Sequence, residues 1–545
     1  MSPLPNLKRW LAFGITSGVF VAILVIGGLG DPTRAKVNAN TQNPAKSDVP
    51  AAGTLEHPMF GGTPFRNMVS STAKNLPVQW SIEEGTKDVK WSADLGSKAY
   101  GGPVIAGGRV FVGTNNMKPR DKKFTENGKP IDMGVVMAFN EGDGKFLWQH
   151  AFFKLAAGRV QDWPREGICS TPVVEGNRMY YVSNRCEVVC ADTSGPEIWK
   201  LDMIKTLGVF PHNLAVCSPL LVGNHLFLVT SNGVDEGHIN VPAPKAPSFI
   251  KLDKKDGKVL WQNNSPTIRL TEVPKEGDQE SFFKRLVNRG ELIQHGQWSN
   301  PAFAAVGGQN QVIFPGGEGK IYSFDPDTGK MIWTFDCNPK DARYELAGTG
   351  TRSDFIATPV IHDNKVYIGV GQDPEHEFGV GHLWCIDMTK KGDVSTEIVT
   401  DYDVYPPKTK PNPNSAMVWH FGGPAPKGTG RNYFFGRTMS TCAVHDGLCY
   451  AAELAGYLHC LDARTGKLYW SHDTKAQVWS SPFWADGKVY LGADDGTIWV
   501  FAHGKNKKIL AQNDMGTAVR ATPVVANGVL YVMTENKLYA IANKK

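Results

Sequence analysis

Aromatic and charged side chains recur at one position along this 545-residue sequence, two residues before a pair made of a small residue and, in most copies, proline. Side chains alternate between the two faces of a strand, so residues at the same distance from the pair should face the same way in every copy. We expect this set to surround a common axis. Its members are Tyr100, Cys169, Val216, Trp298, Ile356, Met439, Trp479 and Arg520.

Two residues further upstream in their copies lie Asp354 and Arg437, and Glu166 stands nearby in its own copy. Flat aromatic rings together with arginine could hold a planar anionic ligand between them. The alternative is that these side chains fill and rigidify the axis, with Asp354 and Arg437 forming an ion pair between neighbouring copies. The residues predicted to bind a ligand in the channel are Tyr100, Glu166, Trp298, Asp354, Arg437, Trp479 and Arg520.

Other chemistry leaves few traces in the sequence. No catalytic carboxylate pair and no Ser/His/Asp set can be read, so no catalytic residue is predicted. The sequence contains no haem-attachment motif, no paired Cys-x-x-Cys zinc site and no phosphate-binding P-loop. We expect most loop histidines to be solvated and predict no metal site. The histidines in question are His212, His238, His295, His376 and His382.

The elements that would position the axial residues are defined by an internal repeat. A typical copy opens with the small-residue–proline pair and a strand and continues through two more strands. It ends in an Asp-x-x-Thr-Gly-Lys turn with a Trp three positions after the Lys. The clearest endings are 324–333 and 461–470. The openings are Gly102-Pro103, Thr171-Pro172, Ser218-Pro219, Asn300-Pro301, Thr358-Pro359, Thr441-Cys442, Ser481-Pro482 and Thr522-Pro523.

Eight copies of four short strands predict an all-β fold, an eight-bladed β-propeller of four-stranded antiparallel blades. The 58 glycines and 35 prolines agree with many tight turns. The eighth copy stops one strand short, while residues 89–93 form an ending without an opening. We therefore expect the N-terminal strand to complete the last blade and close the ring. Two copies, ending near Val394 and near Leu510, lack the Trp.

The repeated tryptophans are interpreted as wedges between blades, because an indole buries a large apolar surface. Cys190, Cys385 and Cys460 share one repeat position with Ala138, Ser323 and Ala540, which indicates a small buried residue there. Cys186 and Cys190 are too far apart on one strand to form a disulfide, whereas a Cys169–Cys217 bridge stays open. The predicted inter-blade tryptophans are Trp91, Trp148, Trp199, Trp261, Trp333 and Trp470.

The Thr-Gly-Lys-x-x-Trp endings resemble the repeat of pyrroloquinoline-quinone (PQQ)-like propellers over residues 85–545. That family includes quinoprotein alcohol dehydrogenases and the non-enzymatic propeller lipoprotein of outer-membrane assembly, so the resemblance implies the fold and leaves the activity open. Residues 166–170, 183–187 and 435–441 also resemble uncharacterised membrane-associated propeller proteins of planctomycete-like bacteria. This second resemblance implies location and fold, and no activity.

The N-terminus predicts attachment to a membrane. Residues 1–9 are a basic segment, expected to be cytoplasmic, and the uncharged apolar run 10–30 is about 21 residues long, enough to span a bilayer. Residues 31–57 are expected to form a flexible tether, and residues 58–545 the propeller with inserts at 115–134, 265–297 and 395–435. The predicted location is the cytoplasmic membrane by a single N-terminal span, with the propeller on the periplasmic side. The alternative is a cleaved signal and secretion to the periplasm.

Two functions are carried forward. The first is a non-catalytic scaffold or protein-binding module whose partners are other extracytoplasmic or membrane proteins. The alternative, implied by the resemblance, is a quinoprotein dehydrogenase with PQQ and Ca²⁺ in the channel. The sequence lacks the adjacent-cysteine disulfide common in that family, which disfavours the alternative. A carbohydrate- or peptide-degrading propeller enzyme stays open, and nucleic-acid binding is not expected at a net charge of only +5 without a basic block.

Overall fold

The computed structural model describes residues 55–83, 86, 88–238, 241–266, 295–342, 350–401, 404, 406–428 and 430–543. The predicted segments 1–9 and 10–30, almost all of the 31–57 tether and most of the 265–297 insert lie outside these residues. None of the helices within the described ranges has the length and apolar character needed to cross a membrane.

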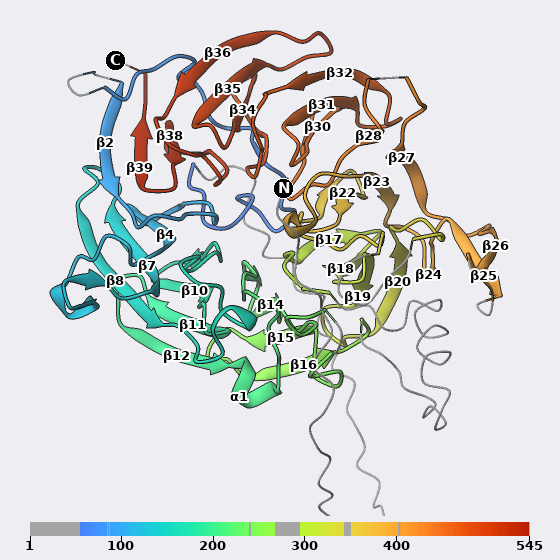
Figure 1. Cartoon of the computed structure of the whole chain (residues 1–545), viewed down its shortest axis with the longest axis horizontal. Coiled ribbons are helices and arrows are strands. Elements are labelled where there is room, and N and C mark those ends of the chain that lie inside the picture. Colours follow the sequence, from blue (N-terminus) through green and yellow to red (C-terminus); the bar gives the residue numbers. More distant parts are fainter. Residues whose placement is uncertain are drawn as a thin grey trace, which may run out of the picture. The chain divides into compact units, whose positions relative to one another are not determined.

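The described residues form eight four-stranded antiparallel blades arranged in a ring (Figure 1), as the repeat predicted. Blades 1 to 4 follow one another along the chain. Blade 1 contains β3 (Val104–Ala106), β4 (Arg109–Asn115), β7 (Met133–Asn140) and β8 (Phe146–Phe153), and blade 2 contains β9 (Val173–Glu175), β10 (Arg178–Val182), β11 (Glu187–Asp192) and β12 (Glu197–Asp202). Blade 3 contains β13 (Leu220–Val222), β14 (His225–Val229), β15 (Phe249–Asp253) and β16 (Val259–Asn263), and blade 4 contains β17 (Ala302–Val306), β18 (Gln309–Pro315), β19 (Lys320–Phe324) and β20 (Met331–Asp336).

Blades 5 to 8 complete the ring. Blade 5 contains β21 (Val360–His362), β22 (Lys365–Gly371), β23 (Gly381–Asp387) and β27 (Met417–Pro424), with β28 (Tyr433–Phe435) at its edge. Blade 6 contains β29 (Ala443–His445), β30 (Leu448–Ala452), β31 (Tyr457–Asp462) and β32 (Leu468–Asp473), and blade 7 contains β33 (Phe483–Ala485), β34 (Lys488–Gly492), β35 (Thr497–Ala502) and β36 (Ile509–Asp514). Blade 8 contains β37 (Val524–Ala526), β38 (Val529–Met533), β39 (Lys537–Ile541) and β2 (Val89–Asp94).

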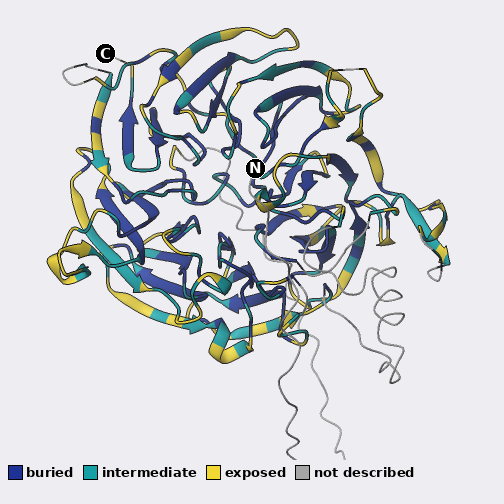
Figure 2. Cartoon of the chain, in the orientation of Figure 1, coloured by how far each residue is buried: buried dark blue, intermediate teal, exposed yellow. Residues whose placement is uncertain are grey.

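The ring closes through β2, whose Trp91 lies opposite Ala540 of β39. The prediction that the first repeat ending completes the last blade is therefore confirmed. Figure 2 shows that the inner strands are mostly buried, while the outer strand of each blade is largely half-buried or exposed. The core thus lies between neighbouring blades and toward the axis.

Short elements decorate the ring. In the predicted insert 115–134, η1 (Lys122–Phe124) is followed by the hairpin β5 (Thr125–Glu126) and β6 (Lys129–Pro130). The remaining short helices are η2 (Gly158–Val160), α1 (Met203–Leu207) and η4 (Pro374–His376). After blade 5's third strand, β24 (Gly392–Asp393) adds to blade 4, and β25 (Glu397–Asp401) pairs with β26 (Lys408–Pro411).

Blade 5 ends at a different place from the one predicted. Its outer strand is β27, inside the predicted insert 395–435, and the expected ending near Val394 is wrong. The chain first runs to blade 4, where Gly392 lies beside Trp333, and returns only after the β25–β26 hairpin. Trp419 of β27 lies opposite Cys385, so this blade has its tryptophan after all.

Most tryptophans of the outer strands lie opposite a small residue of the third strand, and the exception is Trp261, which lies opposite Lys251. The register pairs Ala138 with Trp148 and Cys190 with Trp199, and blade 7 has Val500 opposite Ala511 in place of a tryptophan. All nine cysteines are free, so the Cys169–Cys217 bridge does not form. Small side chains at this position leave room for the indole on the same sheet face.

The indoles reach the next blade. The N–H of Trp91 donates to the carbonyl of Glu141 in the turn between β7 and β8 (2.8 Å). Gly144 of that turn has φ +70°, and a Cβ there would lie 2.5 Å from the ring of Trp91, so the turn needs glycine both for its backbone and for the indole. The equivalent donations run from Trp148 to Thr193, Trp199 to Lys254, Trp261 to Pro326, Trp419 to Ala463 and Trp470 to Gly504, at 2.9–3.2 Å.

Trp333 departs from this pattern. Its indole donates to the side-chain oxygen of Gln311 within its own blade (2.8 Å), and the amide of Gln311 donates to the carbonyl of Met388 in blade 5 (3.0 Å). The inter-blade hydrogen bond is therefore relayed through a glutamine. Trp333 is fully buried.

Residues 55–82, which we call the N-terminal strap, run past the inner strands of the ring. Leu55 accepts a hydrogen bond from Asn527 of blade 8 (2.7 Å), and His57 bridges Ile105 of blade 1. The three residues 55–57, expected to belong to a flexible tether, are thus bound to the propeller. Further contacts join Pro58 to Val174 of blade 2, Arg66 to Pro219 of blade 3, Pro64 to Phe303 of blade 4, Phe65 to Ile361 of blade 5, Met68 to Cys442 of blade 6 and β1 (Val69–Ser70) to β33 of blade 7.

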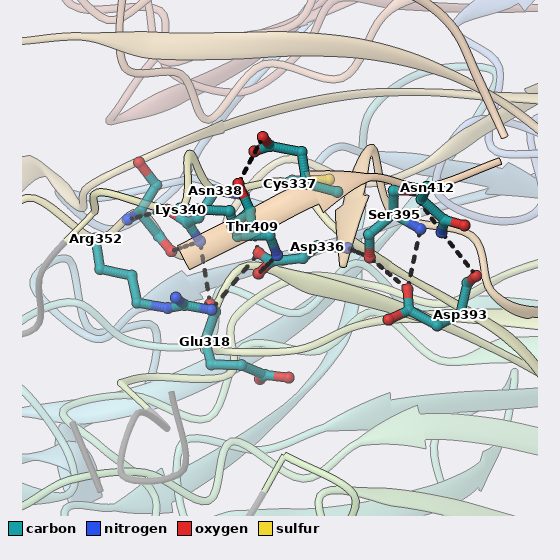
Figure 3. A network of polar contacts seen from close by, with 12 residues as sticks. Glu318, Asp336, Cys337, Asn338, Lys340, Arg352, Asp393, Ser395, Thr409 and Asn412 are labelled. Atoms are coloured by element: carbon teal, nitrogen blue, oxygen red, sulfur yellow. Dashed lines mark hydrogen bonds and ion pairs between the residues drawn. The ribbon is translucent and has the colours of Figure 1, made fainter. Parts of the chain in front are cut away.

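A buried polar network fixes the segment between β23 and β27 of blade 5 to blade 4 (Figure 3). Lys340 and Arg352 approach the carboxylate of Asp336 at 2.6 and 3.6 Å. The backbone N–H of Asp336 donates to the Ser395 hydroxyl (3.0 Å), and the amide of Asn412 donates to the Ser395 carbonyl (2.9 Å). Although burial opposes ionisation, the two cations lower the pKa of Asp336 to about 2.

Candidate functional site

An axial pocket of about 340 Å³ lies where the inner strands of the blades begin. It is lined by all eight of the residues that the repeat predicts to surround the axis, so one side chain from each blade reaches it. Phe60 of the N-terminal strap also lines it. The remaining lining residues used below are Trp163, Glu166, Asp373 and Glu375.

A circle of hydrogen bonds joins the blades just below these side chains. In blades 1, 2, 3, 5, 6 and 7 the backbone N–H of the opening residue donates to the side-chain oxygen of the opening residue in the next blade, as from Thr171 to Ser218 (3.0 Å). The circle is open between blades 8 and 1, because Gly102 has no side chain that could accept from Thr522. The circle explains why these openings carry Thr, Ser or Asn. The other donations run from Gly102 to Thr171, Ser218 to Asn300, Thr358 to Thr441, Thr441 to Ser481 and Ser481 to Thr522, while the Asn300 side-chain amide donates to Thr358.

Among the described residues, Arg520 is the one arginine or lysine in the pocket lining, and its charge is already compensated. Its guanidinium forms a two-pronged ion pair with Asp494, at 2.5 and 3.1 Å. It lies 5.8 Å from the ring centre of Tyr100 and 5.6 Å from that of Trp479. Burial lowers the pKa of Arg520, but the hydrogen bond that its guanidinium donates to Asp494 outweighs burial and raises the pKa above its usual value. The predicted aromatic sandwich therefore already holds a cation of the protein.

The pocket wall carries more negative than positive charge. Glu166, Asp373 and Glu375 all line it, and Oε2 of Glu166 is buried without a hydrogen-bond partner among the described residues. Burial, followed by the nearby Glu166 carboxylate, raises the pKa of Tyr100. Burial and then the charge of Asp373 raise the pKa of Glu375. Glu166 as a whole is half-buried, and a buried carboxylate oxygen without a partner favours a cationic or hydrogen-bond-donating ligand.

Asp354 and Arg437 do not line the pocket, and the predicted ion pair between them is wrong. Asp354 faces His295, with Oδ2 3.1 Å from Nδ1. Arg437 donates to the backbone carbonyls of His376 and Glu377 and to the side chain of Gln372. Its two terminal nitrogens are thus bound by acceptors other than the carboxylate of Asp354, while Nε is buried without a hydrogen bond to any described residue.

A cluster of histidines and aspartates lies behind Trp298, at the wall of the pocket. His212, His238 and His295 are all buried, and so is His382 elsewhere, so the expectation that most loop histidines are solvated is wrong for these four. Nε2 of His212 lies 3.2 Å from Nε2 of His238. The indole of Trp298 donates to the carbonyl of His212 (3.1 Å) and covers the cluster.

Two aspartates complete the cluster. His295 lies between Asp354 and Asp373, with Nε2 3.3 Å from Asp373 Oδ2. Asp373 also accepts from His376 Nδ1 (3.0 Å). Burial raises the pKa of the Asp373 carboxyl, but the hydrogen bond from His376 outweighs burial and lowers the pKa to about 2. Ligand atoms of His212, His238 and His295, and likewise of His295, Asp354 and Asp373, lie within 4.8 Å of one another, close enough to share a metal ion.

Comparison with known families shows which family the chain belongs to. The sequence matches the family described as outer membrane protein assembly factor BamB over residues 132–403 and 412–545. The chain belongs to this BamB family. The PQQ-like resemblance drawn from the repeat is thereby confirmed.

Individual relatives are distant from this BamB-family chain. Tetrathionate hydrolase of Acidithiobacillus ferrooxidans is 19% identical over 430 residues, which cover 76% of this chain and 66% of that enzyme, just under two thirds of its length. A europium-containing methanol dehydrogenase has a TM-score of 0.55 at 15% identity, covering 90% of this chain and 98% of its own. A quinohemoprotein alcohol dehydrogenase of Pseudomonas putida HK5 has a TM-score of 0.53 at 14% identity, covering 90% and 81%. At 14–15% identity, the likeness to these two solved structures shows a common fold and nothing further.

The repeat of this BamB-family propeller located the axial residues but not the histidine–aspartate cluster. The axial set follows from strand periodicity, which is local. The cluster draws on loops of blades 3, 4 and 5, whose lengths do not repeat. One signal was available, because Asp373 and His376 are three residues apart directly after β22 and approach each other on one turn of η4.

Proposed function

We propose that this propeller binds a small organic ligand in the axial pocket, one with a cationic group and an apolar or aromatic-compatible body. The observation that carries the proposal is the buried carboxylate oxygen of Glu166 without a partner, facing a pocket with aromatic walls. The aromatic residues are Phe60, Tyr100, Trp163, Trp298 and Trp479, and because Tyr100 and Trp479 already face Arg520, the ammonium group would contact the other three. Aromatic faces and carboxylates together are the usual receptors for ammonium groups.

The same charges speak against a planar anion. PQQ carries three carboxylates, and the only lysine or arginine in the pocket lining is Arg520, which is held by Asp494. Glu166 and Glu375 would face the quinone acids, and all nine cysteines are free. The residues present do not fit PQQ, and we derive no quinone chemistry. Tetrathionate, a dianion, meets the same obstacle.

Ligand titration tests this proposal. Choline should raise the melting temperature of residues 55–545 in a dose-dependent way, whereas PQQ with Ca²⁺ and tetrathionate should leave it unchanged. Glu166→Gln should weaken choline binding at least tenfold, and the exposed Glu126→Gln on β5 should not. Binding of either anion with no response to choline would overturn the proposal.

The proposed site of action is outside the cytoplasm, with the chain held at the cytoplasmic membrane by residues 10–30. The basic residues before the apolar run support this orientation, and so does membership of a family described as an outer-membrane assembly factor. A fusion of alkaline phosphatase to the C-terminus should be active in whole cells. Activity confined to fusions that lack residues 1–30 would contradict the orientation.

A second candidate function is the scaffold or protein-binding role. It is favoured by the β25–β26 hairpin, which projects from the rim of the ring beyond blades 4 and 5 (Figure 1). Its strands pair with each other and leave their outer sides free of other described strands. Replacement of residues 397–411 by a short glycine linker should abolish co-purification of an extracytoplasmic partner and leave choline binding intact. If the partner still co-purifies with the variant that lacks the hairpin, the protein-binding function of the hairpin is contradicted.

A further inference from the structure

The strongest unexplained feature of the molecule is the histidine cluster behind Trp298. His212 precedes β13, His238 lies between β14 and β15, and His295 precedes β17, so the three come from loops of two neighbouring blades. The 3.2 Å between Nε2 of His212 and Nε2 of His238 is close to the edge of a tetrahedron around zinc, which is about 3.3 Å for Zn–N bonds of about 2.0–2.1 Å.

The protonation of His212 is fixed by its backbone contact. Its Nδ1 lies 2.9 Å from the carbonyl of Val234, and a carbonyl can only accept, so Nδ1 carries the proton. The lone pair of Nε2 therefore points at His238. A backbone carbonyl that orients an imidazole in this way is the usual support of a metal-binding histidine.

His295 provides the second, independent observation. It is buried, and neither of its ring nitrogens makes a directed hydrogen bond to any described residue. Both carboxylate oxygens of Asp354 are likewise buried and without such a bond. These four buried atoms lie on two residues, and their contacts with carboxylates, at 3.1 Å to Asp354 and 3.3 Å to Asp373, lack hydrogen-bond geometry. Because buried polar groups are nearly always hydrogen-bonded, the arrangement indicates a missing partner. A cation bound to Nε2 of His295 would leave the ring proton on Nδ1, where Asp354 can accept it.

We propose that this cluster binds one divalent transition-metal ion, Zn²⁺ in the first instance, through His212, His238, His295 and Asp373. Nε2 of His295 would bind the ion, and Asp354 would accept from Nδ1 of the same ring, a carboxylate–histidine–metal arrangement. Imidazole ligands select zinc and its neighbours over Ca²⁺ or Mg²⁺. Asp373 also lines the axial pocket, so the ion would lie at the pocket wall, but the inference does not depend on what occupies the pocket.

Metal titration of the chain without a histidine tag tests the site. After chelator treatment and dialysis, the protein should bind one equivalent of Zn²⁺, and Co²⁺ should give the intense visible absorption of a tetrahedral complex. His238→Ala should weaken binding at least 100-fold. The matched control is His420→Ala, because His420 and His382 form a second histidine pair at 2.9 Å that belongs to no metal-binding group among the described residues.

Two further measurements distinguish loss of the metal site from loss of the fold. Asp354→Asn keeps the side-chain volume and should weaken Zn²⁺ binding about 10- to 100-fold, while the circular dichroism of the metal-free protein stays that of the wild type. The proposal is overturned if the wild type binds neither ion at micromolar concentration, or if His238→Ala and His420→Ala bind equally well. Preference for Ca²⁺ over Zn²⁺ would overturn the assignment of imidazole ligands.

Discussion

Arg66 donates a hydrogen bond to the carbonyl of Pro301, a residue 235 positions away in the sequence, and both are buried (2.9 Å). The same guanidinium donates to the carbonyls of Phe60, Ser218 and Pro219 at 3.0–3.1 Å. It therefore joins the N-terminal strap to the inner ends of blades 3 and 4. Burial lowers the pKa of Arg66 to about 10, which measures how far the charge is removed from water.

Replacement of Arg66 should loosen the strap and destabilise the ring. Arg66→Ala leaves four carbonyls without their donor and opens a cavity, at an expected cost of about 3–5 kcal/mol in the free energy of unfolding. Calorimetry should show a clear fall in melting temperature, whereas the exposed Arg464→Ala should change it little. Equal melting temperatures for the two variants would contradict the role assigned to the strap.

Trp419 should be as important as the tryptophans that the repeat identifies. Its indole is buried, donates to Ala463 and packs on the turn glycine Gly466. Trp419→Ala should cost about 3–5 kcal/mol, and Trp419→Phe, which keeps most of the apolar contact, clearly less. Urea unfolding measures both, with the exposed Phe153→Ala as control. A neutral Trp419→Ala would show that blade 5 is held by its insert alone.

Glu318 should give the protein a pH-dependent stability. Burial raises the pKa of this carboxyl, which is hydrogen-bonded to Tyr322, to about 7, whereas an unfolded glutamate titrates near 4.5. Between these two values the folded protein keeps a proton that the unfolded chain releases, so the free energy of unfolding falls as the pH rises through this window, by about 3 kcal/mol in total.

Substitution isolates this effect. Glu318→Gln mimics the protonated carboxyl and should remove the difference in melting temperature between pH 5 and pH 8 that Glu318 contributes. Glu397→Gln, in the β25–β26 hairpin, serves as the control. An unchanged pH profile in Glu318→Gln would mean that the carboxyl is ionised in the fold at neutral pH.

The ring could be predicted because its determinants are local in sequence. The features that were not predicted depend on contacts between residues far apart in sequence. The strand order and the closure by β2 follow from turns and strands that repeat in sequence. Trp419 was not predicted, because the β25–β26 hairpin separates it in sequence from the turn that ends the third strand of its blade. The partners of Arg66 are backbone carbonyls, which leave no mark in a sequence. The net charge of the pocket could not be predicted either, because the ion pair between Arg520 and Asp494 depends on the position of a neighbouring loop.

Ser218 provides a test of the hydrogen-bond circle beneath the pocket. Its hydroxyl accepts from the buried backbone N–H of Thr171, so Ser218→Ala leaves that donor unsatisfied and should cost about 1–3 kcal/mol. Ser218→Thr should be tolerated, because threonine holds the equivalent position in blades 2, 5, 6 and 8. Hydrogen exchange at the Thr171 amide should accelerate in the alanine variant and stay slow in the threonine variant. If exchange is equally slow in both, the circle is held by packing of the inner strands, and the Thr, Ser and Asn openings have no share in closing the ring.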